Sequence, residues 1–285
     1  MVGCAEAAGV VLAGGRSSRM GRAKATLEWH GSTLLHRATA LLARTVGGPV
    51  LVVAAPGQEL PELPVGVEVV ADPVEGQGPM RGLATGLTAL DGRAPVAFVC
   101  STDLPFLHPA LVRRVVRGFA DPATDVVLPV ARGYRQPLAA GYRTSLAPLI
   151  EKLLGEGDLR PGMLFRHCEV TQLDDDALLA DAELARLDPA LDSLVNVNEP
   201  ADYATALARP APEVVVERFG ALAGGGQRGP RTVRAVSLGG AAAAVGLTLD
   251  RHVVAAVNGD QMTRDGRHPL VAGDTVAFLS ADAGG

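Results

Sequence analysis

Short, fully apolar segments alternate with longer segments of mixed polarity over most of the chain. The apolar segments have the length and aliphatic composition of buried strands, and the mixed segments repeat apolar residues every three or four positions, as amphipathic helices do. Strands that are apolar on both faces and alternate with helices are typical of a parallel sheet covered on both sides. The pattern therefore predicts an α/β fold with a Rossmann-like, three-layer, mostly parallel sheet. The predicted strands are 9–13, 49–55, 67–71, 95–100 and 125–130, and the predicted helices are 33–46, 82–90 and 107–119.

The pattern changes after a short segment rich in proline. The later elements expected before that segment are a strand at 136–142, a helix at 145–154 and a last strand at 193–198. The segment itself, 209–212, reads RPAP and has the composition of a stiff linker. The sequence thus predicts two domains, 1–208 and 213–285, joined by this linker.

The segment after the linker predicts a small α+β domain. The pair Asn258-Gly259 is a strong signal for a tight hairpin turn. The segment 235–245 has the composition of a helix, although Gly239 and Gly240 weaken that prediction. The predicted strands are 214–219, 252–257 and 275–279.

Composition narrows the classes of function. The chain is 48% hydrophobic and 20% charged, which is typical of a globular protein. Its net charge of -5 provides no basic surface for phosphate backbones, so we expect no nucleic-acid partner. No apolar stretch reaches the roughly 20 residues of a membrane span, and we expect a cytoplasmic protein without a membrane partner. The three cysteines lack paired metal-binding spacing, so neither a disulfide framework nor a zinc site is expected.

The loop after the first strand carries the strongest chemical signal. Gly14 and Gly15 would let backbone N–H groups approach an anion, and Arg19 and Lys24 add positive charge suited to a polyphosphate. Lysine is scarce, because only Lys24 and Lys152 occur among 26 basic residues. The loop matches neither a Walker A motif nor the glycine motif of dinucleotide-binding folds. It nevertheless predicts a nucleotide site.

Four motifs, in order, resemble those of the molybdenum cofactor guanylyltransferases, the MobA-like branch of the nucleotidyltransferases. The resemblance implies that a phosphate monoester, molybdopterin or Mo-molybdopterin, attacks the α-phosphate of GTP and that pyrophosphate leaves. It covers about 190 residues and favours GTP because the loop begins Leu-Ala-Gly-Gly. The motifs are LAGGRSSRMGRAK at 12–24, DP at 72–73 with GPMRGL at 78–83, STDLPF at 101–106 and NVNEP at 196–200.

The resemblance implies a role for each candidate residue. Arg19, Lys24 and Asp103 would be the catalytic residues. Arg19 and Lys24 would hold the triphosphate, and Asp103 would bind Mg²⁺. Asn198 would face the phosphate of the pterin substrate. The implied nucleotide-binding residues are Leu12, Ala13, Gly14, Gly15, Arg19, Lys24, Asp72 and Asp103.

Several of these residues also have a simpler interpretation. Asp72 before Pro73 suits a turn, and Asp103 before Pro105 suits the start of a helix. Arg81, where the family has a small apolar residue, would either contact phosphate or lie in solvent. The rival enzyme is a CTP-dependent molybdopterin cytidylyltransferase or a sugar-phosphate nucleotidyltransferase. The rival of another class is a non-catalytic nucleotide-binding scaffold beside a working sulfur carrier.

The last domain resembles the β-grasp, ubiquitin-like sulfur carriers of the MoaD and ThiS type. The resemblance rests on VERFGAL at 216–222, AVNGD at 256–260, PLVAGDTVAFL at 269–279, Gly284 and Gly285. It implies that the carboxylate of Gly285 is adenylated and converted to a thiocarboxylate for molybdopterin synthesis. The implied partners are an adenylating enzyme and the large subunit of molybdopterin synthase.

Overall fold

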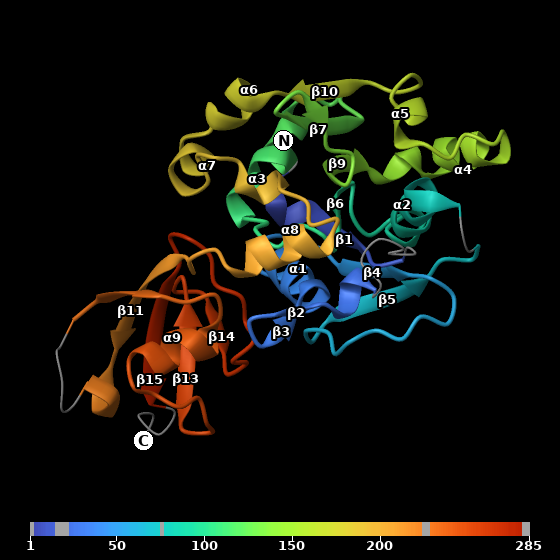
Figure 1. Ribbon diagram of the computed structural model, residues 1–285. Helices are drawn as coiled ribbons and strands as arrows, with labels where there is room; N and C mark the ends of the chain where they lie inside the picture. Colours follow the sequence, from blue (N-terminus) through green and yellow to red (C-terminus); the bar gives the residue numbers. More distant parts are fainter. Residues whose placement is uncertain (1–2, 15–22, 75–76, 224–228, 281–285) are drawn as a thin grey trace. The chain divides into compact units, whose positions relative to one another are not determined.

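The chain forms two compact units, each with its own sheet and hydrophobic core (Figure 1). The first unit comprises Met1–Trp29 and Thr33–Ala206, and the second comprises His30–Ser32 and Leu207–Gly285. This computed structural model describes residues 3–14, 23–74, 77–223 and 229–280.

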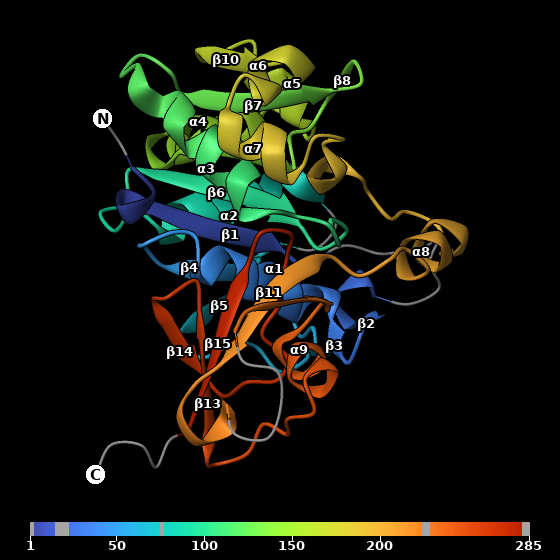
Figure 2. The same ribbon diagram turned by 90° about the vertical axis from the view of Figure 1, so that its left-hand side faces the viewer.

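A mixed, mainly parallel sheet forms the centre of the first unit. Its strands lie in the order β10-β7-β9-β6-β1-β4-β5, with β8 paired to β7. Figure 2 shows β10, β7, β6, β1, β4 and β5 following one another in this order. The central strand β1 is parallel to β4 and β6, and β9 is antiparallel to both of its neighbours. The strands are β1 (Ala7–Leu12), β4 (Val50–Ala54), β5 (Val67–Ala71), β6 (Val96–Ser101), β7 (Val126–Ala131), β8 (Tyr134–Arg135), β9 (Ala139–Arg143) and β10 (Val170–Leu173).

Burial explains which strands the sequence predicts well. All residues of β1 and β4 are buried, as are those of β6 up to Ser101, and these strands confirm the predicted parallel centre. The strand β5 also forms where expected, but it lies at the edge of the sheet and Val69 is half exposed. The expectation that every strand is covered on both faces is therefore wrong for β5.

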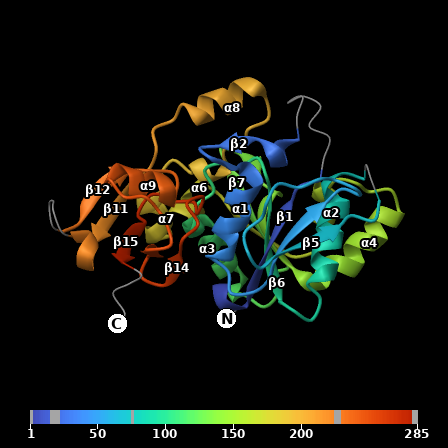
Figure 3. The same ribbon diagram turned by 90° about the horizontal axis from the view of Figure 1, so that it is seen from below.

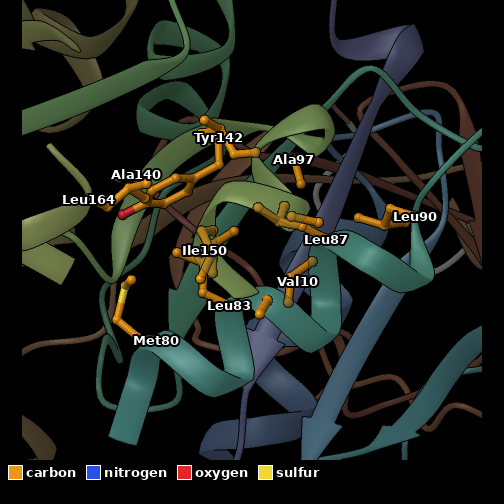
Figure 4. Packing of buried hydrophobic residues seen from close by; sticks show 14 of the residues in the cluster. Val10, Met80, Leu83, Leu87, Leu90, Ala97, Ala140, Tyr142, Ile150 and Leu164 are labelled. Carbon is orange, nitrogen blue, oxygen red and sulfur yellow. The ribbon is translucent and has the colours of Figure 1, made fainter. Parts of the chain in front are cut away.

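Helices cover both faces of this sheet, as predicted (Figure 3). The helices α2 and α4 pack on one face, where apolar side chains such as Leu87 and Ile150 meet Val10 of β1 (Figure 4). On the other face, Gly9 of β1 lies against Leu42 of α1. The main helices are α1 (Leu34–Ala43), α2 (Gly78–Ala89), α3 (Pro109–Arg117) and α4 (Ala147–Gly155), and shorter ones are α5 (Pro161–Leu164), α6 (Asp175–Leu179), α7 (Ala182–Leu187) and α8 (Pro200–Leu207).

The helix α2 shows how local sequence sets an element at the site. Gly78 has a φ of +70°, a left-handed conformation that favours glycine, and Pro79 in the first turn has a ring that fits the start of a helix. Further along, a Cβ at Gly86 would lie 2.8 Å from Cγ1 of Val10. The glycine therefore allows α2 to approach the central strand closely.

The predicted strand at 193–198 is wrong. This segment instead contains a 3-10 turn at Asp192–Leu194 followed by irregular chain. The carboxylate of Asp188 accepts hydrogen bonds from the backbone N–H groups of Asp192 and Ser193, at 2.7 and 3.0 Å. Because those N–H groups are bonded locally, they do not join a strand ladder.

The second unit is built on a five-stranded mixed sheet in the order β12-β11-β15-β13-β14. The central pair, β11 and β15, is parallel, and the other neighbours are antiparallel. The predicted strands at 214–219, 252–257 and 275–279 are confirmed, whereas β12 and β14 were not expected. The elements are β11 (Glu213–Arg218), β12 (Arg231–Arg234), α9 (Leu238–Ala244), β13 (Val253–Val257), β14 (Gln261–Thr263) and β15 (Thr275–Ser280).

The helix and the turn expected in this unit are both present. The hydroxyl of Ser237 accepts a hydrogen bond from the N–H of Gly240 and so caps α9, which stabilises a helix that contains two glycines. Asn258 and Gly259 both have positive φ and connect β13 to β14. Across the part of the chain that the structure covers, no helix combines the length and hydropathy needed to cross a bilayer.

Candidate active site

A pocket of about 620 Å³ lies at the carboxyl ends of strands in the first unit's sheet. It lies where β1, β4, β5 and β6 end and where α2 begins, and most of its lining is apolar. In open α/β sheets, ligands bind at the carboxyl ends of strands where the strand order reverses, and β1 occupies that place here between β4 and β6. The lining includes Leu12, Gly14, Ala54, Ala55, Gln58, Asp72, Gln77, Gly78, Pro79, Gly82, Ser101 and Leu138.

The predicted residues Leu12, Gly14 and Asp72 line this pocket. Ala13 lies between the first two, and its N–H donates a hydrogen bond to the carbonyl of Val53 at 2.9 Å. A Cβ at position 14 would lie 3.2 Å from the backbone nitrogen of Ala55, so glycine lets the chains after β1 and β4 run close together. The predicted residues Gly15 and Arg19 lie outside the described residues.

Asp72 serves as a turn residue and as part of the pocket lining. Its N–H donates to the carbonyl of Ala54 at 2.8 Å, and its Oδ1 accepts from the N–H of Val74 at 3.3 Å. Partial burial raises the pKa of the Asp72 carboxyl, while Val74, Arg81 and Thr85 act in the opposite direction. The expectation that this residue forms a turn is therefore confirmed, and the residue also lines the pocket.

Three predicted residues from distant parts of the sequence meet beside the pocket. Nζ of Lys24 donates to Oδ2 of Asp103 at 3.0 Å and to Oδ1 of Asn198 at 2.9 Å. The side chains of Lys24 and Asp103 are 19% and 14% exposed, so the ion pair is partly shielded from water. Ser101, at the end of β6, lines the pocket and donates a hydrogen bond from its hydroxyl to Oδ1 of Asp103. This bond links the pocket to the charged cluster.

Backbone contacts hold the cluster together. Lys24 opens a 3-10 turn whose next residue, Ala25, is buried. The N–H of Val197 donates to the carbonyl of Asp103 at 2.9 Å, which brings Asn198 to the end of β6. The interpretation of Asp103 as the start of a helix is wrong, because α3 begins at Pro109 and its cap is His108. The carboxylate of Asp103 thus contacts Lys24 and Ser101 and caps no helix.

The oxygen atoms of the cluster suit Mg²⁺. The carboxylate of Asp103 and the amide oxygen of Asn198 are hard donors, which this ion prefers. Among the described residues, no three His, Cys, Asp or Glu side chains gather as a closed metal site. Magnesium at nucleotide sites usually takes one or two carboxylates and completes its coordination with phosphate and water. The residues present therefore fit a metal that is shared with a nucleotide.

Arg81 and Gln58 were not correctly anticipated. The alternative that Arg81 lies in solvent is wrong, because its side chain is only 12% exposed and its guanidinium donates to both carboxylate oxygens of Glu151, at 2.6 and 2.7 Å, and to Gln77 at 2.8 Å. The alternative that it contacts phosphate stays a prediction. Gln58 follows β4 and lines the pocket, and no sequence motif indicated it. The only feature of the sequence that could have indicated Gln58 is its position, as an amide side chain soon after the buried strand β4.

Comparison with known proteins gives this site a context. Residues 9–170 match the model of the MobA-like NTP transferase domain. The chain belongs to this MobA-like family. It is a nucleotidyltransferase. The matched segment of this MobA-like chain includes the carboxyl ends of all four strands that end at the pocket, together with Lys24 and Asp103. Asn198 comes from beyond it.

Named relatives agree with this assignment, and a solved structure shares the fold of the first unit. Two relatives are named "Probable molybdenum cofactor guanylyltransferase". The one from Mycobacterium tuberculosis H37Rv is 43% identical over 164 residues, which cover 55% of this chain and 78% of the relative. The one from Mycobacterium avium strain 104 is 42% identical over 153 residues, covering 53% and 76%. The fold is similar to that of molybdopterin-guanine dinucleotide biosynthesis protein A from Archaeoglobus fulgidus, with a TM-score of 0.55 and 21% identity over 70% of this chain and 96% of that one.

Proposed function

We propose that the chain transfers GMP from GTP to molybdopterin or Mo-molybdopterin and releases pyrophosphate. The observation that carries the proposal is the meeting of Lys24, Asp103 and Asn198 beside a nucleotide-sized pocket at the carboxyl ends of the strands. The names of the mycobacterial relatives support guanosine as the nucleoside and the molybdenum cofactor as the acceptor. In the reaction, a phosphate oxygen of the acceptor forms a bond to the α-phosphorus of GTP, and the bond from that phosphorus to the bridging oxygen breaks.

The residues of the site have distinct roles in this proposal. Leu12, Ala13 and Gly14 form the wall for the guanine and ribose, and the carboxylate of Asp72 contacts the nucleotide. Lys24 neutralises the triphosphate, together with Arg19, and Asn198 orients the phosphate of the acceptor. Asp103 and Asn198 would hold Mg²⁺, which supplies positive charge at the phosphates when it is bound.

The ion pair between Lys24 and Asp103 has a consequence for this cycle. The ammonium group of Lys24 is paired with Oδ2 of Asp103 at 3.0 Å, so a bound triphosphate must compete with this carboxylate for the ammonium group. Phosphoryl transfer depends on positioning and charge neutralisation more than on covalent chemistry by the protein. We therefore expect Lys24 to exchange its carboxylate partner for phosphate oxygens when GTP binds.

Two measurements test the proposed function. Pyrophosphate release is measured with molybdopterin and each of GTP, CTP, ATP and UTP, and the proposal expects release with GTP. Asp103→Ala should abolish release, whereas an exposed carboxylate outside the pocket provides the control, Glu156→Ala. Release with CTP but not GTP would reject the choice of nucleotide and favour the cytidylyltransferase alternative. Unchanged release by Asp103→Ala would remove this residue from the reaction.

We further propose that 213–285, after a linker at 209–212, is a β-grasp sulfur carrier for molybdopterin synthesis. Counted within the second unit, the strands lie in the order second, first, fifth, third, fourth, with the first and fifth parallel at the centre. The helix α9 packs against this sheet through Leu238, Ala241 and Ala242. A mixed sheet of this order with one packed helix is the arrangement that the β-grasp resemblance implies. Gly284 and Gly285 lie outside the described residues.

Intact-mass measurement tests the carrier proposal. The chain is incubated with ATP, an adenylating enzyme of this carrier class and a sulfur donor, and conversion of the Gly285 carboxylate should add about 16 Da, the difference between sulfur and oxygen. A variant without Gly285 serves as the control. No gain in mass, or an equal gain in that variant, would contradict the proposal. A partner assay with the large subunit of molybdopterin synthase would then follow.

A further inference from the structure

The side chain of Gln58 joins the two loops that form one wall of the pocket. Its Nε2 donates to the carbonyl of Ala13 at 3.1 Å, after β1, and its Oε1 accepts from the N–H of Ala55 at 2.9 Å, after β4. Its own N–H donates to the carbonyl of Ala55 at 3.1 Å. One side chain therefore connects the ends of two adjacent parallel strands.

The wall that Gln58 fixes is made mostly of main chain. The N–H groups of Ala13 and Gly14 both donate to the carbonyl of Val53, at 2.9 and 3.2 Å, so they already have partners. Ala54 and Ala55 add no polar side-chain atoms, and the carbonyl of Ala54 accepts the N–H of Asp72. Because little but main chain forms this wall, its spacing and rigidity determine which flat ring fits against it.

Gln58 also keeps hydrogen-bonding capacity for a ligand. A glutamine amide has two N–H donors and two lone pairs, and the contacts seen among the described residues use one of each. Gln58 lines the pocket, so its remaining donor and acceptor are within the part of the chain that a nucleotide would contact. The other glutamine of the lining, Gln77, instead accepts from Arg81 at the start of α2.

We propose that Gln58 is a positioning residue that sets which nucleobase the pocket accepts. This inference rests on the proposed function and adds to it the element that selects the base. With both bonds made, the loops after β1 and β4 stay at one separation, and the preferred base alone meets its hydrogen-bonding partners. Discrimination is strong where a site holds fixed polar groups and weak where those groups can move.

The test compares dissociation constants of GTP and CTP, measured by titration calorimetry on the full chain without acceptor. The variants are Gln58→Leu, which removes both side-chain hydrogen bonds, and Gln58→Glu, which keeps the acceptor and replaces the donor. Gln172→Leu, an exposed glutamine on β10, is the matched control. We expect the selectivity ratio, which is the larger dissociation constant divided by the smaller one in the unmodified chain, to fall about tenfold in Gln58→Leu. Each net hydrogen bond contributes a few-fold to such a ratio. Gln58→Glu should lower the ratio as well, because its carboxylate faces the carbonyl of Ala13.

The outcomes separate this inference from the proposed function. If the unmodified chain prefers CTP and Gln58→Leu removes that preference, the proposed nucleotide is wrong and the inference about Gln58 stands. If the unmodified chain prefers GTP and both variants keep the ratio within twofold, the inference is wrong and the proposed function stands. A variant that only lowers the melting temperature while the ratio holds shows a purely structural role and also overturns it. Should Gln58→Leu fail to fold, Gln58→Glu alone decides. Equal binding of GTP and CTP by the unmodified chain overturns the inference about Gln58, while the proposed function is decided by pyrophosphate release.

Discussion

The ion pair between Lys24 and Asp103 allows a quantitative prediction. The perturbation is a double-mutant cycle of Lys24→Met, Asp103→Asn and the two together. Both replacements remove a charge and keep nearly the same size. The cycle isolates the interaction between the two side chains from the other effects of each replacement.

The expected coupling follows from distance and burial. At 3.0 Å and an effective dielectric constant of about 20, Coulomb attraction is about 5.5 kcal/mol. Desolvation and lost side-chain freedom offset most of it, because the two side chains are only 19% and 14% exposed. Exposed pairs contribute under about 1 kcal/mol, so we expect a coupling of about 1–2 kcal/mol in the free energy of unfolding of the first unit.

The assay uses the single tryptophan of the chain. Trp29 belongs to the first unit, is buried and packs edge-on against Phe106, with ring centroids 5.7 Å apart. Its fluorescence in urea therefore follows the unfolding of this unit. The four proteins are compared at pH 7 and low salt, and again at high salt, where the coupling should shrink. Lys24→Arg is the control that keeps the charge but changes its geometry.

Additive effects would refute this reasoning. A coupling below about 0.3 kcal/mol is within the usual error of such cycles and would show that the pair does not form in solution. The same four proteins provide a kinetic cycle. If both residues act on one transition state, either replacement should slow GMP transfer by about a hundredfold or more, and the double replacement should cost much less than the product.

Three other predictions concern stability within the first unit, with the same fluorescence measurement. Arginine neighbours lower the pKa of Glu183, so Glu183→Gln should cost about 1 kcal/mol at pH 7, and the difference should vanish as the pH falls through that lowered pKa; a pH-independent difference would contradict this. Burial raises the pKa of Asp72, so the first unit of Asp72→Asn should be as stable as the unmodified unit or more stable at pH 7, and this advantage should disappear as the pH falls. The same variant should bind nucleotide more weakly. A clear loss of stability at pH 7 would argue against this prediction. Gly86→Ala should cost about 1–3 kcal/mol because its Cβ would meet Val10 at 2.8 Å, whereas Gly155→Ala, with nothing within 4 Å, should be neutral or stabilising; equal effects would show that α2 shifts to make room.

The sequence predicts the buried strands well because their chemistry is unambiguous. In β1, β4 and β6, nearly all residues face a hydrophobic layer, so an apolar run is enough to identify them. The strand β10 has no such run, since Thr171 is polar and half-buried and Gln172 is polar and exposed. The prediction of a strand at 193–198 is wrong for the opposite reason: the segment has apolar residues, but they are packed in a turn that Asp188 stabilises.

The site, like the fold, has residues that the sequence predicts and residues that it does not. Motifs identified Lys24, Asp103 and Asn198, but their meeting depends on chain reversals that bring together residues up to 174 positions apart. No local pattern encodes such a contact. Gln58 escaped notice because its partners are backbone atoms, which every residue carries, so its sequence context shows nothing distinctive. Its importance becomes visible only when the ends of β1 and β4 lie side by side.

The transfer reaction itself tests the central claim most directly. The chain is incubated with molybdopterin, Mg²⁺ and GTP labelled at the α-phosphate, and the pterin product is separated from free nucleotide. The proposed function predicts that the label moves to the pterin, that an equal amount of pyrophosphate appears, and that CTP labelled at the same position gives no product. Label transferred from CTP, or label recovered only in free nucleotide, would contradict the account.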